Sequence, residues 1–142
     1  MAKVAGVCMS AVRGVQKTNV GKAYLKQDWG LEGDAHADHW HRQVSLLSKQ
    51  KIDAFRAEGA QVDDGAFGEN IIVDGIDCNK LPVGTRLRCG QALLEITQIG
   101  KECHHGCAIM KTMGKCIMPT NGVFARVLEG GWVEQGDEIA VL

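Results

Sequence analysis

Short alternating runs of apolar and polar residues occupy most of this chain and predict β-strands. The runs are separated by glycine, proline, asparagine and aspartate, the residues that favour turns. The expected strands are Lys3–Val12, Val20–Leu25, Gln43–Leu47, Ile71–Val73, Thr85–Cys89, Ala92–Ile99, Val123–Leu128 and Glu138–Leu142. Because most of these strands are short, we expect a mainly β, barrel-like fold with one or two short helices rather than a parallel sheet.

One segment, Ser48–Glu58, has the period of a helix. Ser48 is expected to cap its N-terminus, and Leu47 and Ile52 to pack on one another across the first turn as a hydrophobic staple. Ile52 and Phe55 fall on one face of the helix, which we expect to face the core. No rhythm of strand, helix and strand repeats along the chain.

A stretch of sixteen residues, Gln27–Arg42, has no regular period and is expected to be a long functional loop. It holds two tryptophans, three histidines and three aspartates, which makes it a candidate metal loop. Its spacing matches no standard zinc pattern, however, and solvated histidines among turn-forming residues explain the same composition.

The 142 residues are enough for one core, so a single domain over residues 1–142 is expected. A formal charge of −1 gives no long-range field that would attract nucleic acid or an anionic membrane, so any anionic ligand needs a local pocket. No apolar run is long enough to span a membrane, and the N-terminus lacks the pattern of a signal peptide. We therefore expect a cytoplasmic protein with a small-molecule partner.

A second irregular segment gathers half of the six cysteines within residues 99–116. Its cysteines and histidines are Cys103, His104, His105, Cys107 and Cys116. In a reducing compartment such thiols are ligands or nucleophiles rather than parts of a disulfide framework. The reactive form is the thiolate, which the charge of Lys101 and of the imidazoles would favour. Cys8 and Cys89, by contrast, fall within apolar alternation and are expected to be small buried hydrophobes.

Seven landmarks occur in a defined order along the chain. They are Gly30-x-x-Gly33-Asp34-x-His36, His41-Arg42-Gln43-Val44-Ser45-Leu46, Phe67-Gly68-Glu69-Asn70, Leu81-Pro82-Val83-Gly84, the loop that contains Cys103, Gly122-Val123-Phe124-Ala125-Arg126-Val127, and Gly136-Asp137. In order and spacing they resemble the MOSC domain family, the domain found at the C-terminus of molybdenum cofactor sulfurases. The resemblance covers nearly the whole chain, and it implies a β-rich, barrel-like fold that binds the molybdenum cofactor, molybdopterin.

The resemblance also implies a cysteine that ligates molybdenum or carries sulfur destined for it. Cys103 takes this place because it follows the strand end Thr97-Gln98, as in relatives with one cysteine there. Other relatives have a Cys-x-x-Cys pair, whereas here three residues separate Cys103 from Cys107, so Cys107 is the second candidate.

The remaining site residues follow from what a pterin cofactor needs: a clamp for its phosphate, polar partners for its ring and a soft ligand for its metal. The expected cofactor-binding residues are Arg42 and Arg126 for the phosphate, Glu69 and Asn70 for the ring, and His36 and Lys101 beside them. Either arginine could instead form a structural ion pair with Asp34 or Glu69.

The implied function is that of a sulfur carrier or cofactor handler in molybdenum cofactor metabolism, with a cysteine desulfurase or a molybdoenzyme as partner. One alternative is a component of a molybdenum-dependent reductase of N-hydroxylated small molecules, which leaves the enzyme class open between sulfur transferase and oxidoreductase. Another alternative is a zinc-binding structural module that uses Cys103, Cys107, Cys116 and one of His104 or His105.

The cysteine hypothesis makes a prediction. Cys103→Ser keeps the size of the side chain but removes the soft sulfur, so the protein should fold normally and lose molybdenum or its sulfur load. Metal content by elemental analysis and persulfide content by thiol labelling measure this result. Retention by Cys103→Ser with loss by Cys107→Ser would transfer the role to Cys107. Normal behaviour of both variants would contradict a cysteine-centred function, and joint protection of the three loop thiols until a chelator is added would favour zinc.

Overall fold

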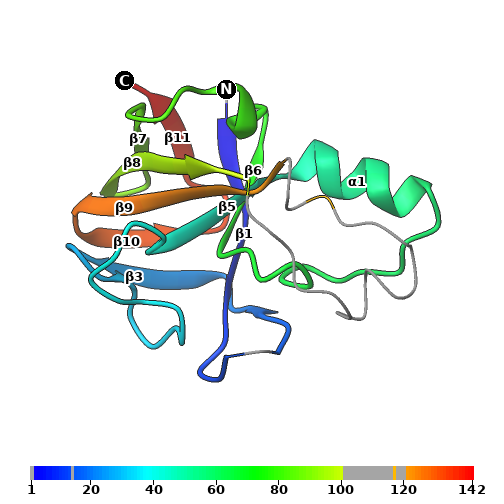
Figure 1. Cartoon of the computed structure of the whole chain (residues 1–142), viewed down its shortest axis with the longest axis horizontal. Coiled ribbons are helices and arrows are strands. Elements are labelled where there is room, and N and C mark those ends of the chain that lie inside the picture. The colour runs from blue at the N-terminus through cyan, green and yellow to red at the C-terminus, as the bar shows by residue number, and fades with distance from the viewer. Residues whose placement is uncertain (1, 14, 101–116, 118–120) are drawn as a thin grey trace.

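The computed structural model describes residues 2–13, 15–100, 117 and 121–142, and most of this part of the chain is β-structure (Figure 1). The strands of the main sheet are β1 (Ala2–Met9), β5 (Val44–Ser48), β6 (Ile71–Asp74), β7 (Arg86–Cys89), β8 (Ala92–Ile99), β9 (Val123–Glu129) and β11 (Glu138–Val141). They pair in the order β1, β6, β5, β9, β8, β7 and β11, and β11 also pairs with β1, which closes the sheet into a barrel. The expected mainly β barrel is confirmed.

A smaller sheet of three strands consists of β4 (Gly30–Leu31), β3 (Lys22–Lys26) and β10 (Gly131–Glu134), with β3 in the middle. A further short strand, β2 (Thr18–Asn19), pairs with the end of β1. The sequence pattern did not predict β10, because Gly130 before it and Gly131 at its first position suggest a turn. Both are needed for close backbone approach: a Cβ at Gly130 would lie 2.8 Å from the Leu25 carbonyl oxygen, and one at Gly131 would lie 2.6 Å from the Gln91 Cβ.

Alternate side chains of the strands fill the barrel and remove its apolar groups from water. Leu46, Leu94 and Val127 are at most 2% exposed and belong to one continuous cluster. The small sheet contributes to the same cluster through residues such as Leu25 and Val133. The two sheets therefore share one core.

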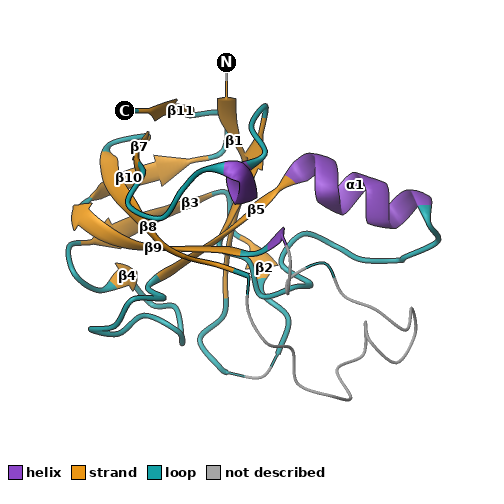
Figure 2. Ribbon diagram, turned by 45° about the horizontal axis from the view of Figure 1, so that its top comes forward, coloured by secondary structure: helices purple, strands orange, loops and turns teal. Residues whose placement is uncertain are grey.

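The helix α1 (Lys49–Ala57) follows β5 directly (Figure 2), and the next strand along the chain is β6. β5 and β6 are parallel, so they form a strand–helix–strand unit that the sequence analysis did not expect. Ile52 and Phe55 are buried as predicted, in a second apolar cluster that also contains Leu47. This cluster joins α1 to strand residues such as Ile72 and Phe124, and the helix lies at one side of the barrel in Figure 1.

Ser48 stands at the N-cap position of α1, but its hydroxyl does not cap the helix. The Ser48 Oγ instead donates to the carbonyl oxygen of Ile76 at 2.9 Å and accepts from the Cys78 N–H at 3.1 Å. Cys78 begins a short 3₁₀ helix, η1 (Cys78–Lys80). The predicted position of Ser48 is therefore correct, but its hydrogen bonds hold the chain after β6 and not the helix.

This assignment predicts the effect of Ser48→Ala. The variant leaves a buried N–H and a carbonyl oxygen without a partner, which should lower the free energy of unfolding by about 1–3 kcal/mol in urea denaturation. Ser45→Ala is a matched control from the same strand, because the Ser45 Oγ is buried and has no hydrogen-bond partner among the described residues. The control should change stability by less than about 0.5 kcal/mol. Equal losses in the two variants would contradict the assignment.

Candidate functional site

A cavity of about 90 Å³ lies where the loops before β2, β5 and β6 meet the start of β9. Its lining residues are Lys17, His36, Trp40, Arg42, Ser45, Gly68, Asn70 and Phe124. A cavity of this size has room for ordered water or for a small polar group. The cavity thus joins three of the residues that the sequence analysis proposed, His36, Arg42 and Asn70.

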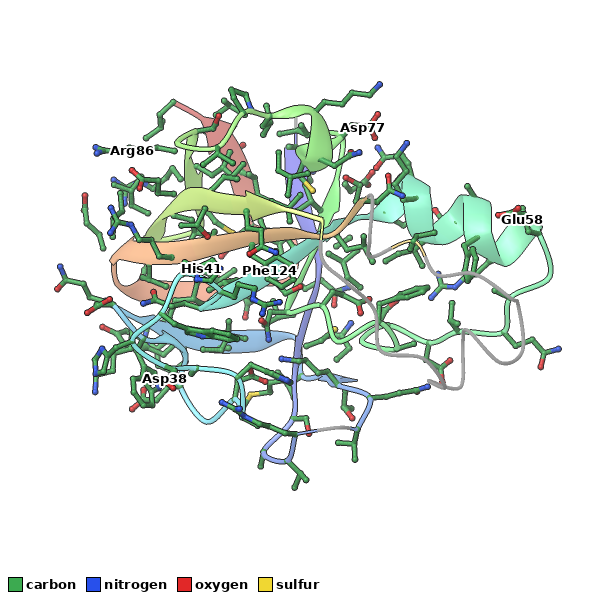
Figure 3. All side chains as sticks on the ribbon, in the orientation of Figure 1. Asp38, His41, Glu58, Asp77, Arg86 and Phe124 are labelled. Carbon is green, nitrogen blue, oxygen red and sulfur yellow. The ribbon has the colours of Figure 1, made fainter. Side chains whose placement is uncertain are left out.

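The guanidinium of Arg42 lies between two aromatic rings. Its Cζ is 5.0 Å from the centroid of the Trp40 ring and 5.4 Å from that of Phe124. Trp40 is itself held by a hydrogen bond of 3.0 Å from its Nε1 to the carbonyl oxygen of His36. Such contacts fix a cation without neutralising it, since aromatic rings carry no net charge. Figure 3 labels Phe124 beside His41, the residue that precedes Arg42.

The Arg42 Nε and the Ser45 Oγ, which belong to cavity residues, are buried without a partner in the described part of the chain. Buried polar groups are almost always hydrogen-bonded, because an unpaired one loses its interaction with water. Both groups can donate a hydrogen bond, and one of them is cationic. The arrangement therefore suits an anionic ligand.

A buried ion pair forms another side of the cavity. The Lys17 Nζ lies 3.0 Å from Oδ1 and 2.8 Å from Oδ2 of Asp34, and the two side chains are 1% and 0% exposed. Asp34 also accepts the backbone N–H groups of Ser10 and His36, at 3.1 and 3.3 Å. Burial lowers the pKa of Lys17 from its usual value, and the Asp34 carboxylate opposes this shift. The sequence analysis missed Lys17, because a lysine in a short loop carries no pattern that marks it.

Glu69, expected to contact the pterin ring, is fully buried and its carboxylate is bound to backbone. Its Oε1 accepts the N–H of Phe67 and its Oε2 that of Gly65, both at 3.0 Å. Burial raises the pKa of Glu69 to about 6, although these hydrogen bonds favour the charged form. Because the folded pKa lies above the ordinary one, the contribution of Glu69 to stability is greatest in acid and falls as the pH rises through about 6.

Asn70 lines the cavity, but its amide also joins two strands. The Oδ1 accepts the N–H of Ser45 at 2.9 Å, and the Nδ2 donates to the carbonyl oxygen of Cys8 at 3.1 Å. Each amide atom keeps capacity for one more hydrogen bond, so Asn70 can still contact a ligand.

Arg126 lies outside the cavity. It projects from β9 and pairs with Glu95 on β8, with its Nη2 3.0 Å from Oε1 of the carboxylate. The two residues are direct neighbours across the strands, and the Arg126 side chain is 49% exposed. The structural ion pair anticipated for an arginine is therefore present at Arg126, with Glu95 as partner in place of Asp34 or Glu69.

The three histidines of the long loop lie apart from one another and contact different groups. His36 lines the cavity, the His39 Nδ1 lies 3.3 Å from the Asp28 carboxylate, and the His41 Nε2 lies 2.8 Å from the Gln98 Oε1. No group of three metal-ligating side chains occurs among the residues that the structure describes. All of 27–42 belongs to this part, so the structure does not support the metal-loop interpretation.

Three cysteines are described, and all are buried free thiols: Cys8, Cys78 and Cys89. Burial raises the pKa of Cys8 and of Cys89 to about 12, and it raises that of Cys78 as well. The expectation that Cys8 and Cys89 are buried hydrophobes is confirmed. Lys101, Cys103, His104, His105, Cys107 and Cys116 lie outside the described residues. The chain on either side of their segment is joined by a 2.6 Å hydrogen bond from the Gly100 N–H to the Gly122 carbonyl oxygen.

The described surface has two larger grooves, of about 510 and 450 Å³, and the first shares Lys17 with the cavity around Arg42. The first contains residues such as Arg56 and Asp64, and the second contains Trp132 and Gln91. Neither is lined by a buried polar atom that lacks a partner among the described residues. The smaller cavity around Arg42 is therefore the better candidate for a specific polar site.

Comparison with protein families gives a match to the MOSC domain over residues 33–140. The chain belongs to the MOSC domain family. This family is associated with the molybdenum cofactor. Comparison with curated proteins gives no significant match.

Solved structures support the same fold. YuaD from Bacillus subtilis is 18% identical, with a TM-score of 0.74 over 97% of this chain and 93% of that one. YiiM from Geobacillus stearothermophilus is 18% identical, with a TM-score of 0.75 over 100% of this chain and 75% of that one. YiiM from Escherichia coli is 23% identical, with a TM-score of 0.71 over 100% and 70%. At these identities the likeness concerns the fold. No helix in the described part of this MOSC protein is long and apolar enough to cross a membrane.

The buried ion pair of the cavity gives a stability prediction. Lys17→Met leaves the Asp34 carboxylate buried without its cation, which should lower the free energy of unfolding by about 3–5 kcal/mol in urea denaturation. The double variant Lys17→Met/Asp34→Asn removes the stranded charge and should recover part of this loss. Lys49→Met is the control, because its pair with Asp53 is about half exposed and should contribute at most about 1 kcal/mol. A loss in Lys17→Met no larger than in the control would contradict the assigned role.

Proposed function

We propose that this MOSC protein binds the molybdenum cofactor in a single domain and acts as a sulfur carrier or cofactor handler through Cys103, with Cys107 as the second candidate. When bound, the cofactor supplies a molybdenum centre that accepts sulfur ligands. The observation that carries the proposal is the pair of unpartnered buried donors in the cavity, the Arg42 Nε and the Ser45 Oγ. They fit an anionic group such as the phosphate of molybdopterin.

The charge of the cavity supports this fit. The Asp34 carboxylate neutralises Lys17, whereas Arg42 is held by rings and keeps its charge. A planar guanidinium binds phosphate oxygens through several N–H groups in a fixed geometry. In this proposal Arg42 is the principal phosphate ligand, with Ser45 and Lys17 as further donors.

The volume of the cavity limits what it can hold. The cavity of about 90 Å³ accommodates a phosphate-sized group. Asn70 and His36 line the cavity and are proposed to make further polar contacts with the cofactor. Arg126 has no part in the proposed site, because it lies outside the cavity and pairs with Glu95.

The proposal is tested by Arg42→Lys. Lysine keeps the charge but lacks the planar fork, so cofactor affinity should fall about tenfold or more while thermal stability changes little. Molybdenum and pterin content of protein purified from a cofactor-producing host, together with thermal unfolding, measure both effects.

Arg126→Lys is the matched control, because it makes the same chemical change on the outside of the barrel. This variant should retain the cofactor as the unmodified protein does. An equal loss of cofactor in both variants, or unchanged retention in Arg42→Lys, would contradict the proposed site. Loss of folding in Arg42→Lys would show instead that Arg42 is structural.

A further inference from the structure

Glu69 is a buried acid that the proposed cofactor contacts do not use. Its side chain lies outside the set that lines the cavity, and both of its carboxylate oxygens accept backbone N–H groups of the preceding turn, Gly65–Gly68. A carboxylate that accepts two such bonds fixes the path of the backbone between them, because each bond is charge-assisted and directional.

The same turn reaches the cavity at two points. Gly68 is one of the lining residues. Gly65 touches the backbone of Lys17: its carbonyl oxygen accepts the Lys17 N–H at 2.9 Å, and a Cβ at Gly65 would lie 2.1 Å from the Lys17 carbonyl oxygen. The position of the turn therefore determines where Lys17 and Gly68 stand relative to Arg42.

We propose that Glu69 is a positioning residue of the anion cavity: by holding the N–H groups of Gly65 and Phe67, its carboxylate keeps Lys17 and Gly68 in the binding arrangement. This inference rests on the proposed anion-binding function. It differs from the expectation that Glu69 contacts the pterin ring, because here Glu69 acts on the ligand only through the turn.

The positioning role and a purely electrostatic role of Glu69 predict opposite changes in anion affinity when Glu69 is removed. Among the described residues, the charged and titratable groups that face Glu69 are Asp64 directly before the turn, the Cys8 thiol on β1 and Lys17. If Glu69 acted on an anion only through its charge, its removal would strengthen anion binding, since like charges repel. If Glu69 acts through position, its removal weakens binding.

Glu69→Gln separates the two effects when sulfate is used as the probe and its affinity is measured by isothermal titration calorimetry. Glutamine removes the negative charge but turns an NH₂ group toward one of the two backbone N–H groups, which breaks that bond. We expect the sulfate affinity to fall about tenfold at neutral pH, the effect of losing roughly one charge-assisted hydrogen bond.

Two control variants isolate this effect. Asp64→Asn removes a neighbouring charge without touching the two N–H groups that Glu69 holds, so its sulfate affinity should equal or exceed that of the unmodified protein. Ser48→Ala lowers stability at a position outside the cavity lining, so it should bind sulfate normally and exclude general destabilisation as the cause.

The pH profile provides a second readout. Sulfate keeps its charge between about pH 5 and about pH 8, whereas burial raises the pKa of Glu69 to about 6. Protonation weakens the two hydrogen bonds, so affinity should fall as the pH drops through about 6, and this fall should be absent in Glu69→Gln. A proton on His36, which lines the cavity, would act in the opposite direction by adding positive charge.

The outcomes distinguish this inference from the proposed function. Weaker binding in Arg42→Lys together with normal or stronger binding in Glu69→Gln would overturn the positioning role and leave the anion site standing. Equal weakening in Glu69→Gln and Ser48→Ala would also overturn it. Absence of sulfate binding by the unmodified protein would overturn the anion site, and the positioning role with it.

Discussion

The buried contact between Lys17 and Asp34 is the constraint on which the candidate site depends. An ammonium and a carboxylate that are 1% and 0% exposed each need the other, because removing one partner leaves an uncompensated buried charge. Asp34 also accepts the N–H groups of Ser10 and His36, so one carboxylate joins the chain after β1 to the long loop before β5. The Lys17 ammonium and the His36 N–H therefore bind the same carboxylate.

Two other charged groups near the cavity have partners that compensate their charge, whereas Arg42 has none among the described residues. Glu69 is bound by two backbone N–H groups, and Lys17 is neutralised by Asp34. Among the charged residues that the structure describes in this cavity, Arg42 is the one held by aromatic rings, which fix the guanidinium but leave its charge available. The net charge of the chain is only −1, so the proposed binding of an anion relies on this local arrangement and not on a field of the whole protein.

The sequence predicted what depends on local pattern. Alternation located β8 at Ala92–Ile99 with the observed bounds, and the helical period identified the buried face of α1. It did not show the parallel pairing of β5 with β6 or the partners of the Ser48 hydroxyl, because both depend on segments far apart in the chain. The residues of the candidate site also divide into those that local sequence pattern identifies and those that only the folded structure brings together. Arg42 stood out within a landmark of the family, whereas Lys17 became visible only once folding placed it beside Asp34.

The described thiols also bear on where sulfur chemistry can occur. A persulfide carrier or metal ligand must reach the thiolate state near neutral pH, and burial raises the pKa of Cys8, Cys78 and Cys89. These three are therefore unsuited to the task, and the proposed role falls to a cysteine among residues 101–116. The anion cavity requires none of them, since its donors are nitrogen and hydroxyl groups of the described chain. Anion binding and sulfur chemistry are thus assigned to different residues, and a substitution at Cys103 can remove the second while the first persists.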